Sequence, residues 1–284
     1  MNRRQALTGL AVLGLTATEL RGRGLQDQAP PPPGRGGTTD LQDLAWPPAV
    51  TGISQAYPTT DLIVARDLVG AAHNNLERVK QLVSSHPELA KVSWDWGFGD
   101  WESALGAASH VGNRPIAEYL LEQGAAPTIF SSAMLGHLDV VRAMITAQPG
   151  LHRLRGPHGI ALIAHARAGG ASAAPVVTYL ESLPGASDPI PTKPLSAEER
   201  AQLVGRYVFG QGPRDVFVID DVREILGITR VGASRRNLLH RGVLAFTPVG
   251  AETVQIRLVR AGDRVDGLTI ASPDVVVRAT RERG

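Results

Sequence analysis

The spacing of hydrophobic residues changes once along this chain and divides it into two kinds of structure. Between Asp61 and Leu183, apolar residues recur about every 3.6 positions, as they do on one face of an α-helix. Between residues 203 and 280 they alternate with polar residues, as in a strand with one buried face. A Pro-rich stretch, residues 184–195, separates the two patterns. The sequence therefore predicts a helical domain over residues 61–183 and a β domain over residues 196–284.

The helical domain contains four copies of one helix-turn-helix pattern. The clearest copy opens with Ser103–Ala108, turns at residues 112–113, continues along the apolar face of Ile116–Leu121 and closes at residues 124–125. The other copies begin near Leu68, Ile129 and Ile160. The four turns fall at positions 75, 112, 136 and 169, which lie 37, 24 and 33 residues apart. Such units bury their apolar faces only by stacking on one another.

These four segments resemble ankyrin repeats, which have a period of about 33 residues and an opening of the form T-P-L-H-x-A. The resemblance covers about residues 66–183 and implies an ankyrin-type α-solenoid of about four helix pairs with a concave binding surface. Residues 91–101 are inserted where ankyrin proteins carry a β-hairpin finger. The step from the second to the third copy is too short to hold a finger, so the concave edge is expected to be irregular.

The β domain begins with a short capped helix at residues 196–200. Short, Gly- and Asp-rich connections between its strands favour antiparallel neighbours, and a small closed or nearly closed β-barrel fits best. The eight candidate strands are Val204–Val208, Val216–Ile219, Glu224–Ile228, Asn237–Leu239, Leu244–Phe246, Val254–Leu258, Gly267–Ile270 and Val275–Val277.

The opening of this domain, Leu203–Tyr207, resembles the start of lipocalin-like accessory domains of exported bacterial proteins. That resemblance implies a regulatory or ligand-contacting appendage, with no catalytic residues to transfer. The alternative is a barrel filled by its own side chains.

The N-terminus resembles a twin-arginine export signal. Arg3 and Arg4 precede a short apolar run that ends at Ala17, and this run is too short to be a permanent membrane span. Residues 18–60 are rich in Pro and Gly and predict an extended linker, with folding expected to begin at a helix cap, Asp61. We therefore expect an exported protein, periplasmic or extracellular in a bacterium. The alternative is an unstructured start with two chance arginines.

Composition narrows the chemistry. The 284 residues include no cysteine, which excludes disulfides, thiolate metal sites and a Cys nucleophile. The net charge is +2 and the basic residues form no run, so no nucleic-acid partner is predicted. No nucleophile elbow, phosphate loop or paired-carboxylate motif is present.

The strongest candidate contact site is the inserted segment Trp94–Glu102, which holds three of the four tryptophans and three carboxylates. Aromatic anchors ringed by polar groups are typical of binding hot spots. The alternative is that these rings fold back over the gap between the first two copies. The predicted partner-binding residues are Trp94, Trp96, Phe98 and Trp101 as anchors, with Asp100, Glu102 and Arg114 to orient the partner.

Histidines near the turns suggest a second possibility, a polar site made by His110, His158 and His165 with Asp100 nearby. Its spacing is unfavourable, because seven residues on one helix separate His158 from His165 by about 10 Å. A single zinc ion with bonds of about 2 Å could not bind both. His158 is therefore interpreted as a cap or groove residue and His137 as part of a structural turn, and no metal or cofactor is predicted.

Together these patterns predict an exported protein that recognises another protein through its helical domain without turnover. Two alternatives stay open. One is an exported hydrolase or metal enzyme that uses His110, His158, His165 and Asp100. The other is a small-ligand carrier, which needs an open apolar barrel interior. The identity of the partner and the oligomeric state do not follow from the sequence.

Overall fold

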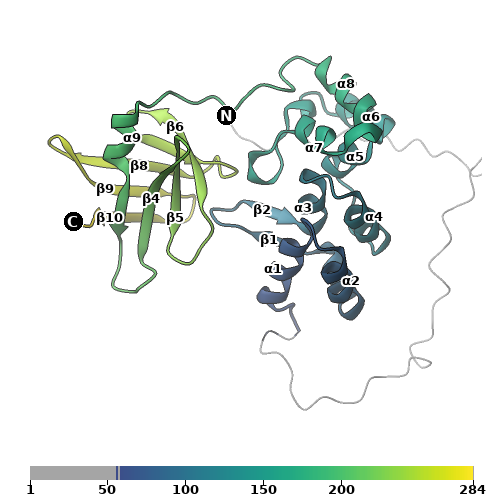
Figure 1. The fold of residues 1–284 in the computed structure, drawn as a ribbon, viewed down its shortest axis with the longest axis horizontal. Helices are drawn as coiled ribbons and strands as arrows, with labels where there is room; N and C mark the ends of the chain where they lie inside the picture. Colours follow the sequence, from purple (N-terminus) through teal and green to yellow (C-terminus); the bar gives the residue numbers. More distant parts are fainter. Residues whose placement is uncertain (1–55, 57, 284) are drawn as a thin grey trace, which may run out of the picture. The chain divides into compact units, whose positions relative to one another are not determined.

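The computed structural model describes residue 56 and residues 58–283, which fall within one compact unit, residues 54–284. In this part of the chain a set of helices is followed by a β-barrel (Figure 1). The predicted export signal, residues 1–17, and nearly all of the predicted linker, residues 18–60, lie outside the described residues.

Helices occupy the predicted helical domain and follow one another in pairs. The two helices of each pair contact each other, and the first helices contact in series, α1 with α3, α3 with α5 and α5 with α7 (Figure 1). Their bounds are α1 (Leu62–Ala71), α2 (Leu76–Ser85), α3 (Ala104–His110), α4 (Arg114–Glu122), α5 (Ile129–Leu135), α6 (Leu138–Ala147), α7 (Leu162–Ala168) and α8 (Ala174–Glu181). Short 3₁₀ turns join them at η2 (Pro87–Lys91), η3 (Leu151–Arg153), η4 (Pro157–Gly159) and η5 (Gly170–Ala173).

Side-chain caps fix where the first five helices begin. Each cap accepts a hydrogen bond from a backbone N–H of the first turn, which otherwise has no partner inside the helix. The predicted cap at Asp61 is confirmed, because its carboxylate accepts from the N–H of Ile63. The other four caps are Asn75, Ser103, Asn113 and Thr128.

The helices bury two apolar clusters. Leu68, Leu105 and Ile116 lie in the cluster of α1 to α4, whereas Leu162 and Leu180 lie in that of α5 to α8. Burying one such side chain contributes about 1.5–3 kcal/mol. Because each cluster draws on more than one helix pair, the pairs depend on one another for stability.

The insertion between the first two helix pairs forms a β-hairpin, as predicted. Its strands β1 (Ser93–Asp95) and β2 (Trp101–Ser103) are antiparallel, with Trp94 opposite Glu102. In the connecting loop, Asp95 Oδ1 accepts hydrogen bonds from the N–H groups of Gly97 and Gly99. The loop is thereby tied to the end of β1.

The β domain is a closed antiparallel barrel, and each predicted strand corresponds to one observed strand. Neighbours follow the order β10-β3-β4-β5-β6-β7-β8-β9. The strands are β3 (Gly205–Val208), β4 (Val216–Val222), β5 (Ile225–Arg230), β6 (Arg236–Gly242), β7 (Ala245–Pro248), β8 (Gln255–Ala261), β9 (Arg264–Ala271) and β10 (Val276–Arg281). The predicted helix before them is α9 (Ala197–Leu203), which begins in a capping box between Ser196 and Glu199.

Buried side chains occupy the barrel interior. Tyr207, Phe246, Ile219 and Ile256 are among them, and the Tyr207 hydroxyl donates a hydrogen bond to the carbonyl of Leu203. A cavity of about 450 Å³ is lined in part by Leu226, Leu238 and Phe246 of the barrel, so the small-ligand carrier hypothesis stays a prediction.

Candidate metal centre

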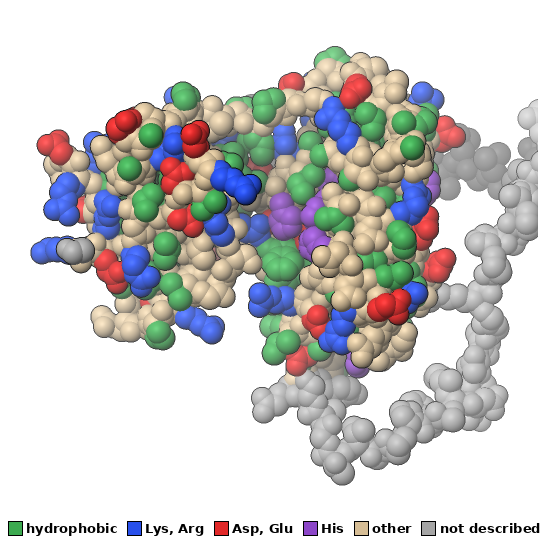
Figure 2. Space-filling model, viewed as in Figure 1, with side chains coloured by type: hydrophobic (Ala, Val, Ile, Leu, Met, Phe, Trp, Pro, Cys, Tyr) green, Lys and Arg blue, Asp and Glu red, His purple; other side chains and the backbone are tan. Residues whose placement is uncertain are grey.

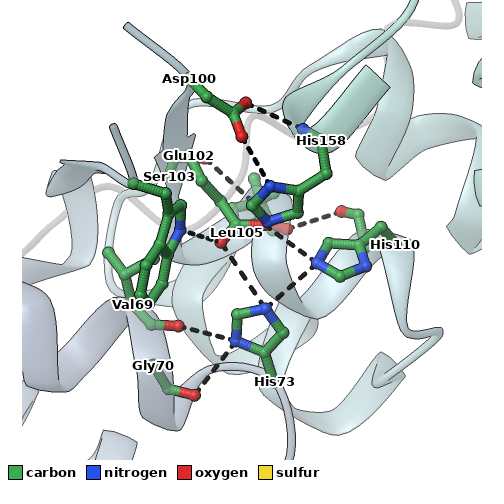
Figure 3. Close-up of polar contacts among 12 residues, drawn as sticks. Val69, Gly70, His73, Asp100, Glu102, Ser103, Leu105, His110 and His158 are labelled. Carbon is green, nitrogen blue, oxygen red and sulfur yellow. Dashed lines mark hydrogen bonds and ion pairs between the residues drawn. The ribbon is translucent and has the colours of Figure 1, made fainter. Parts of the chain in front are cut away.

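Four side chains from separate segments converge beside the β1–β2 hairpin: His73, Glu102, His110 and His158 (Figure 3). One nitrogen or oxygen atom of each lies within 4.8 Å of the corresponding atom of every other. Three imidazoles and one carboxylate at such distances form a set that can share one metal ion.

Local structure explains how three of these side chains reach the same place. Side chains of a strand alternate between faces, so in β2 Trp101 is exposed while Glu102 is fully buried. Ser103 then caps α3, whose last residue is His110. His73 follows the end of α1, and the 37 residues between His73 and His110 equal the spacing of the turns at positions 75 and 112. The two histidines therefore occupy equivalent positions of successive copies, near the ends of two contacting helices.

The fourth side chain, His158, is held in place by Asp100. His158 lies in η4 with a left-handed backbone, φ 59°. The Asp100 carboxylate accepts from the His158 backbone N–H at 2.9 Å and from its Nδ1 at 2.7 Å. Nη1 of Arg236 also lies 2.5 Å from Asp100 Oδ2. This double contact stabilises an otherwise unfavourable backbone conformation and fixes the imidazole ring.

Three of the six separations between the converging atoms are close to those of a metal-bound set. Nε2 of His110 is 2.9 Å from Glu102 Oε1 and 3.2 Å from Nε2 of His73. Nε2 of His158 is 3.4 Å from the same Glu102 oxygen. In a regular tetrahedron with metal bonds of about 2.0–2.1 Å, neighbouring ligand atoms lie about 3.3 Å apart. The observed separations bracket that value.

In His73 and His158 the Nδ1 atom hydrogen-bonds to a neighbouring group, and this orients the Nε2 atom toward the centre. Nδ1 of His73 lies 3.1 Å from the carbonyl oxygens of Val69 and Gly70, which can only accept, so this nitrogen carries the hydrogen. Nδ1 of His158 donates to Asp100 in the same way. In the neutral rings, Nε2 then presents a lone pair to the centre. Metal-binding histidines are commonly oriented by such carbonyl or carboxylate partners.

Glu102 is the most unusual member of the group. Its side chain is 0% exposed, and Oε2 accepts a hydrogen bond of 2.7 Å from the indole Nε1 of Trp96. Oε1 has no hydrogen-bond partner among the described residues. His110 approaches Oε1 closely but without hydrogen-bond alignment. A buried carboxylate oxygen without a compensating partner is costly, and Oε1 lies 2.9 Å from Nε2 of His110 and 3.4 Å from Nε2 of His158, so positive charge at these nitrogens, or a cation bound among them, would stabilise it.

Charges in the cluster strongly perturb its ionisation. Burial opposes ionisation of Glu102, but the nearby His110 and His158, together with the charges of His158 and His73, lower the pKa of Glu102 to about 2. Burial would lower the pKa of His158, whereas Asp100 and Glu102 outweigh it and raise that pKa to about 9. A metal ion and a proton therefore compete for the same ring, and metal binding releases protons.

The centre is reached from a cavity of about 380 Å³. His73 and His158 are partly exposed there, with side-chain exposures of 26% and 27%. Histidine side chains are visible on this face of the molecule, beside hydrophobic and Lys or Arg side chains (Figure 2). The lining residues are His73, Trp96 and His158 with Ser234, Arg235, Arg236, Asn237 and Val249 of the barrel.

Comparison with known proteins adds no assignment to this geometry. No protein-family model matches the chain, and no curated protein is significantly similar to it. Among the helices of residues 58–283, none has both the length and the apolar character needed to cross a membrane.

The predicted aromatic anchors lie in different environments. Trp94 and Trp96 pack against the apolar cluster of α1 to α4, as the fold-back alternative expected. Phe98 packs against the barrel cluster. Trp101 is 62% exposed. Of the four rings, Trp101 is the one most available to another protein.

The polar residues assigned to a partner are used inside the chain. Asp100 and Glu102 are buried and contact histidines, because the hairpin turns both carboxylates inward. Arg114 donates to the Leu135 carbonyl and the Ser172 hydroxyl, so it joins neighbouring helices. Asp100 and Glu102 are therefore not available at the surface, whereas Arg114 keeps a side-chain exposure of 33% and its role toward a partner stays a prediction.

The predicted polar site forms in part. His110, His158 and Asp100 converge. His165 is fully buried behind His110, with ring centroids 6.3 Å apart, and packs against Phe130 outside the group of four. The spacing argument assumed one helix for His158 and His165, but η4 ends before α7 begins. Its conclusion for this pair still holds, because His165 is not in the group of four. His137 is exposed at the start of α6, outside the cluster.

The sequence interpretation missed His73 and assigned Glu102 another role. One signal could have found His73, namely that it repeats the position of His110 at the spacing of the turns. No local sequence signal indicates that His158 lies beside His73 and His110. It is 48 positions after His110 and lies in a different turn, η4.

Proposed function

We propose that this protein binds one divalent transition-metal ion through His73, Glu102, His110 and His158. The observation that carries the proposal is the convergence of three imidazoles on the fully buried Glu102 carboxylate, whose Oε1 lacks an aligned hydrogen bond. Its separations from His110 and His158 are those of ligands that share one ion.

The donor set indicates the kind of metal. Three imidazoles and one carboxylate suit Zn²⁺, Co²⁺, Ni²⁺ or Fe²⁺, whereas Ca²⁺ and Mg²⁺ prefer oxygen ligands. Near-tetrahedral separations favour Zn²⁺, for which Co²⁺ is a spectroscopic substitute. We therefore propose zinc as the native ion.

The cavity beside the centre indicates chemistry on a small molecule. His73 and His158 are partly exposed to it, so a water molecule or a substrate oxygen can join the four side chains as a fifth ligand, an expansion that zinc accepts. A zinc ion lowers the pKa of bound water toward neutrality and polarises carbonyl groups. We propose metal-assisted hydrolysis of a small molecule as the reaction that the site supports best.

Metal content tests the proposal directly. Purified full-length protein should hold one equivalent of zinc by mass spectrometry, and stripped protein should take up one equivalent of Co²⁺ with tetrahedral absorption bands. Glu102→Gln and His110→Ala should lose the equivalent. His137→Ala, which removes an exposed histidine outside the cluster, should keep it. Equal metal content in Glu102→Gln and wild type would exclude the centre.

We also propose that the helices around the centre form an ankyrin-type solenoid and that the chain is exported. Support for the solenoid is the repeated pattern, the contacts between successive first helices and the hairpin inserted between copies. Export rests on the N-terminal sequence. Replacing Arg3 and Arg4 by lysine should leave the protein in the cytoplasm of an expressing bacterium, and undiminished export would contradict the signal.

Recognition of another protein stays a second candidate because Trp101 is exposed. It borders a hollow of about 580 Å³ together with Leu154, which is 40% exposed. An aromatic ring beside an apolar side chain is typical of a binding hot spot. Trp101→Ala should abolish capture of a partner from an envelope extract without loss of helicity, whereas Val111→Ala, another exposed apolar residue, should not. Unchanged capture by Trp101→Ala would remove this candidate.

A further inference from the structure

We propose that the metal centre takes a small monocarboxylate as its exogenous ligand, held between the metal ion and the guanidinium group of Arg236. This inference rests on the metal function proposed above and specifies the class of molecule that enters the site.

Arg236 is the first observation. It begins strand β6, and only 8% of the residue is exposed. Nη1 pairs with Asp100, but Nε and Nη2 are buried without a hydrogen-bond partner anywhere in the described part of the chain. A buried guanidinium N–H group without an acceptor costs stability. A ligand oxygen would supply the acceptor, and carboxylates match the guanidinium fork in geometry.

The position of Arg236 is the second observation. The residue lines the same cavity as His73 and His158. Its Nη1 lies 3.1 Å from Nδ1 of His158, and both nitrogens approach the Asp100 carboxylate. The guanidinium group is therefore next to a ring that binds the metal, so one small anion can reach both.

Charge balance favours a single negative charge on the ligand. Two charges from the metal and one from Arg236 stand against one each from Asp100 and Glu102, which leaves one positive charge uncompensated. The neighbouring Arg235 is already paired with Asp220 and does not change this balance. Net charge in a buried site is unfavourable, and one monoanion neutralises it.

The volume of the cavity limits the size of the ligand, and its lining indicates the chemical character of the part beyond the carboxylate. Its volume of about 380 Å³ lies at the small end of ligand pockets. The indole ring of Trp96 forms part of the wall, and its N–H is already used by Glu102. The remaining indole surface offers an apolar contact, so a small carboxylate with a short apolar body fits best.

Acetate is the probe. Acetamide, which has the same shape but no charge, is the control. Full-length protein loaded with Co²⁺ should show saturable changes in the cobalt absorption bands on titration with acetate. Acetamide should have little effect. Arg236→Met should weaken the response to acetate tenfold or more while it keeps the cobalt bands. Arg257→Met removes an equal charge at an exposed position of β8 and should respond like wild type.

The possible results separate the two proposals. Absence of cobalt bands in wild type would overturn the metal function, and this ligand with it. Normal cobalt bands that acetate leaves unchanged, or that acetamide changes equally, would overturn the ligand alone. An equal acetate response in Arg236→Met would likewise overturn the role of Arg236. Arg236→Gln serves if the Met variant does not fold by circular dichroism, and the same tenfold loss is expected.

Discussion

Left-handed backbone conformations mark two residues, one in the β1–β2 hairpin loop and one in the proposed metal centre. Phe98, with φ 61°, lies between two glycines in the hairpin loop, and His158 has φ 59°. Such conformations cost a non-glycine residue on the order of 1 kcal/mol and persist where surrounding contacts enforce them. At His158 the enforcing contact is the Asp100 carboxylate, which accepts hydrogen bonds from both its backbone and its ring.

Asp100 should therefore act as a positioning residue for the metal. Asp100→Asn keeps the shape of the side chain but removes the charge that orients His158. We expect zinc affinity to fall about 10- to 100-fold, as is typical when such a partner of a ligand is lost. Competition with a chelator measures the affinity, and altered Co²⁺ bands would report a changed ligand geometry. Asp139→Asn, at an exposed residue of α6, is the control, and equal affinities would contradict the role.

His165 should make the metal-free protein sensitive to acid. Burial and the nearby His110 lower its pKa to about 4, from 6.5 in the unfolded chain. The unfolded chain binds the proton at higher pH than the folded one, so stability falls as pH decreases from about 6.5 to about 4. The contribution of His165 to this loss is on the order of 3 kcal/mol below pH 4.

Replacing the His165 imidazole tests whether its titration causes this loss of stability. His165→Leu should flatten the pH dependence of unfolding by urea between pH 6.5 and 4 in chelator-treated protein. It should not reduce stability at pH 7 by much, because neither ring nitrogen has a hydrogen-bond partner within residues 58–283. A slope equal to that of wild type would show that His165 does not titrate as expected.

At the scale of elements, the hairpin and the helix turns set the geometry of the centre. Strand β2 directs Trp101 outward and Glu102 inward, and α3 then carries His110 to the same place. The turns between paired helices are closely packed. Gly112, with φ 74°, is so close to Ala168 that an added Cβ would lie 2.1 Å from its carbonyl oxygen.

Gly112→Ala should consequently destabilise the helical part by about 2 kcal/mol or more, through backbone strain and the clash with Ala168. Gly70→Ala is the matched control. Gly70 lies inside α1, and an added Cβ would meet no atom within 4 Å. That change should stabilise by about 0.5–1 kcal/mol, since alanine favours a helix more than glycine. Urea unfolding measures both, and equal effects would contradict the close packing.

At the scale of the whole molecule, the centre joins segments that are far apart in the sequence. His73, Glu102, His110 and His158 come from different elements, and Arg236 of the barrel contacts the same group through Asp100. An ion bound to all four ligands therefore restrains the helices, the hairpin and η4 at once.

Zinc should raise the thermal stability of the described unit. Free metal at 100-fold above its dissociation constant adds about 2.7 kcal/mol, which corresponds to roughly 5–10 °C in a unit of this size. Differential scanning calorimetry with and without a chelator measures the shift. Glu102→Gln should abolish it and His137→Ala should retain it. A shift of equal size in Glu102→Gln would indicate that the metal binds elsewhere.

Local sequence signals account for the helices and strands of this protein. Apolar periodicity and capping residues located the helices that begin after Asp61 and Ser103, the inserted hairpin and the eight barrel strands, because those signals act over a few residues. Only the tertiary structure decided that His73, His110 and His158 meet at Glu102. Their meeting depends on how helices stack and on the left-handed turn at His158, and long-range contacts of this kind leave no periodic pattern in the chain.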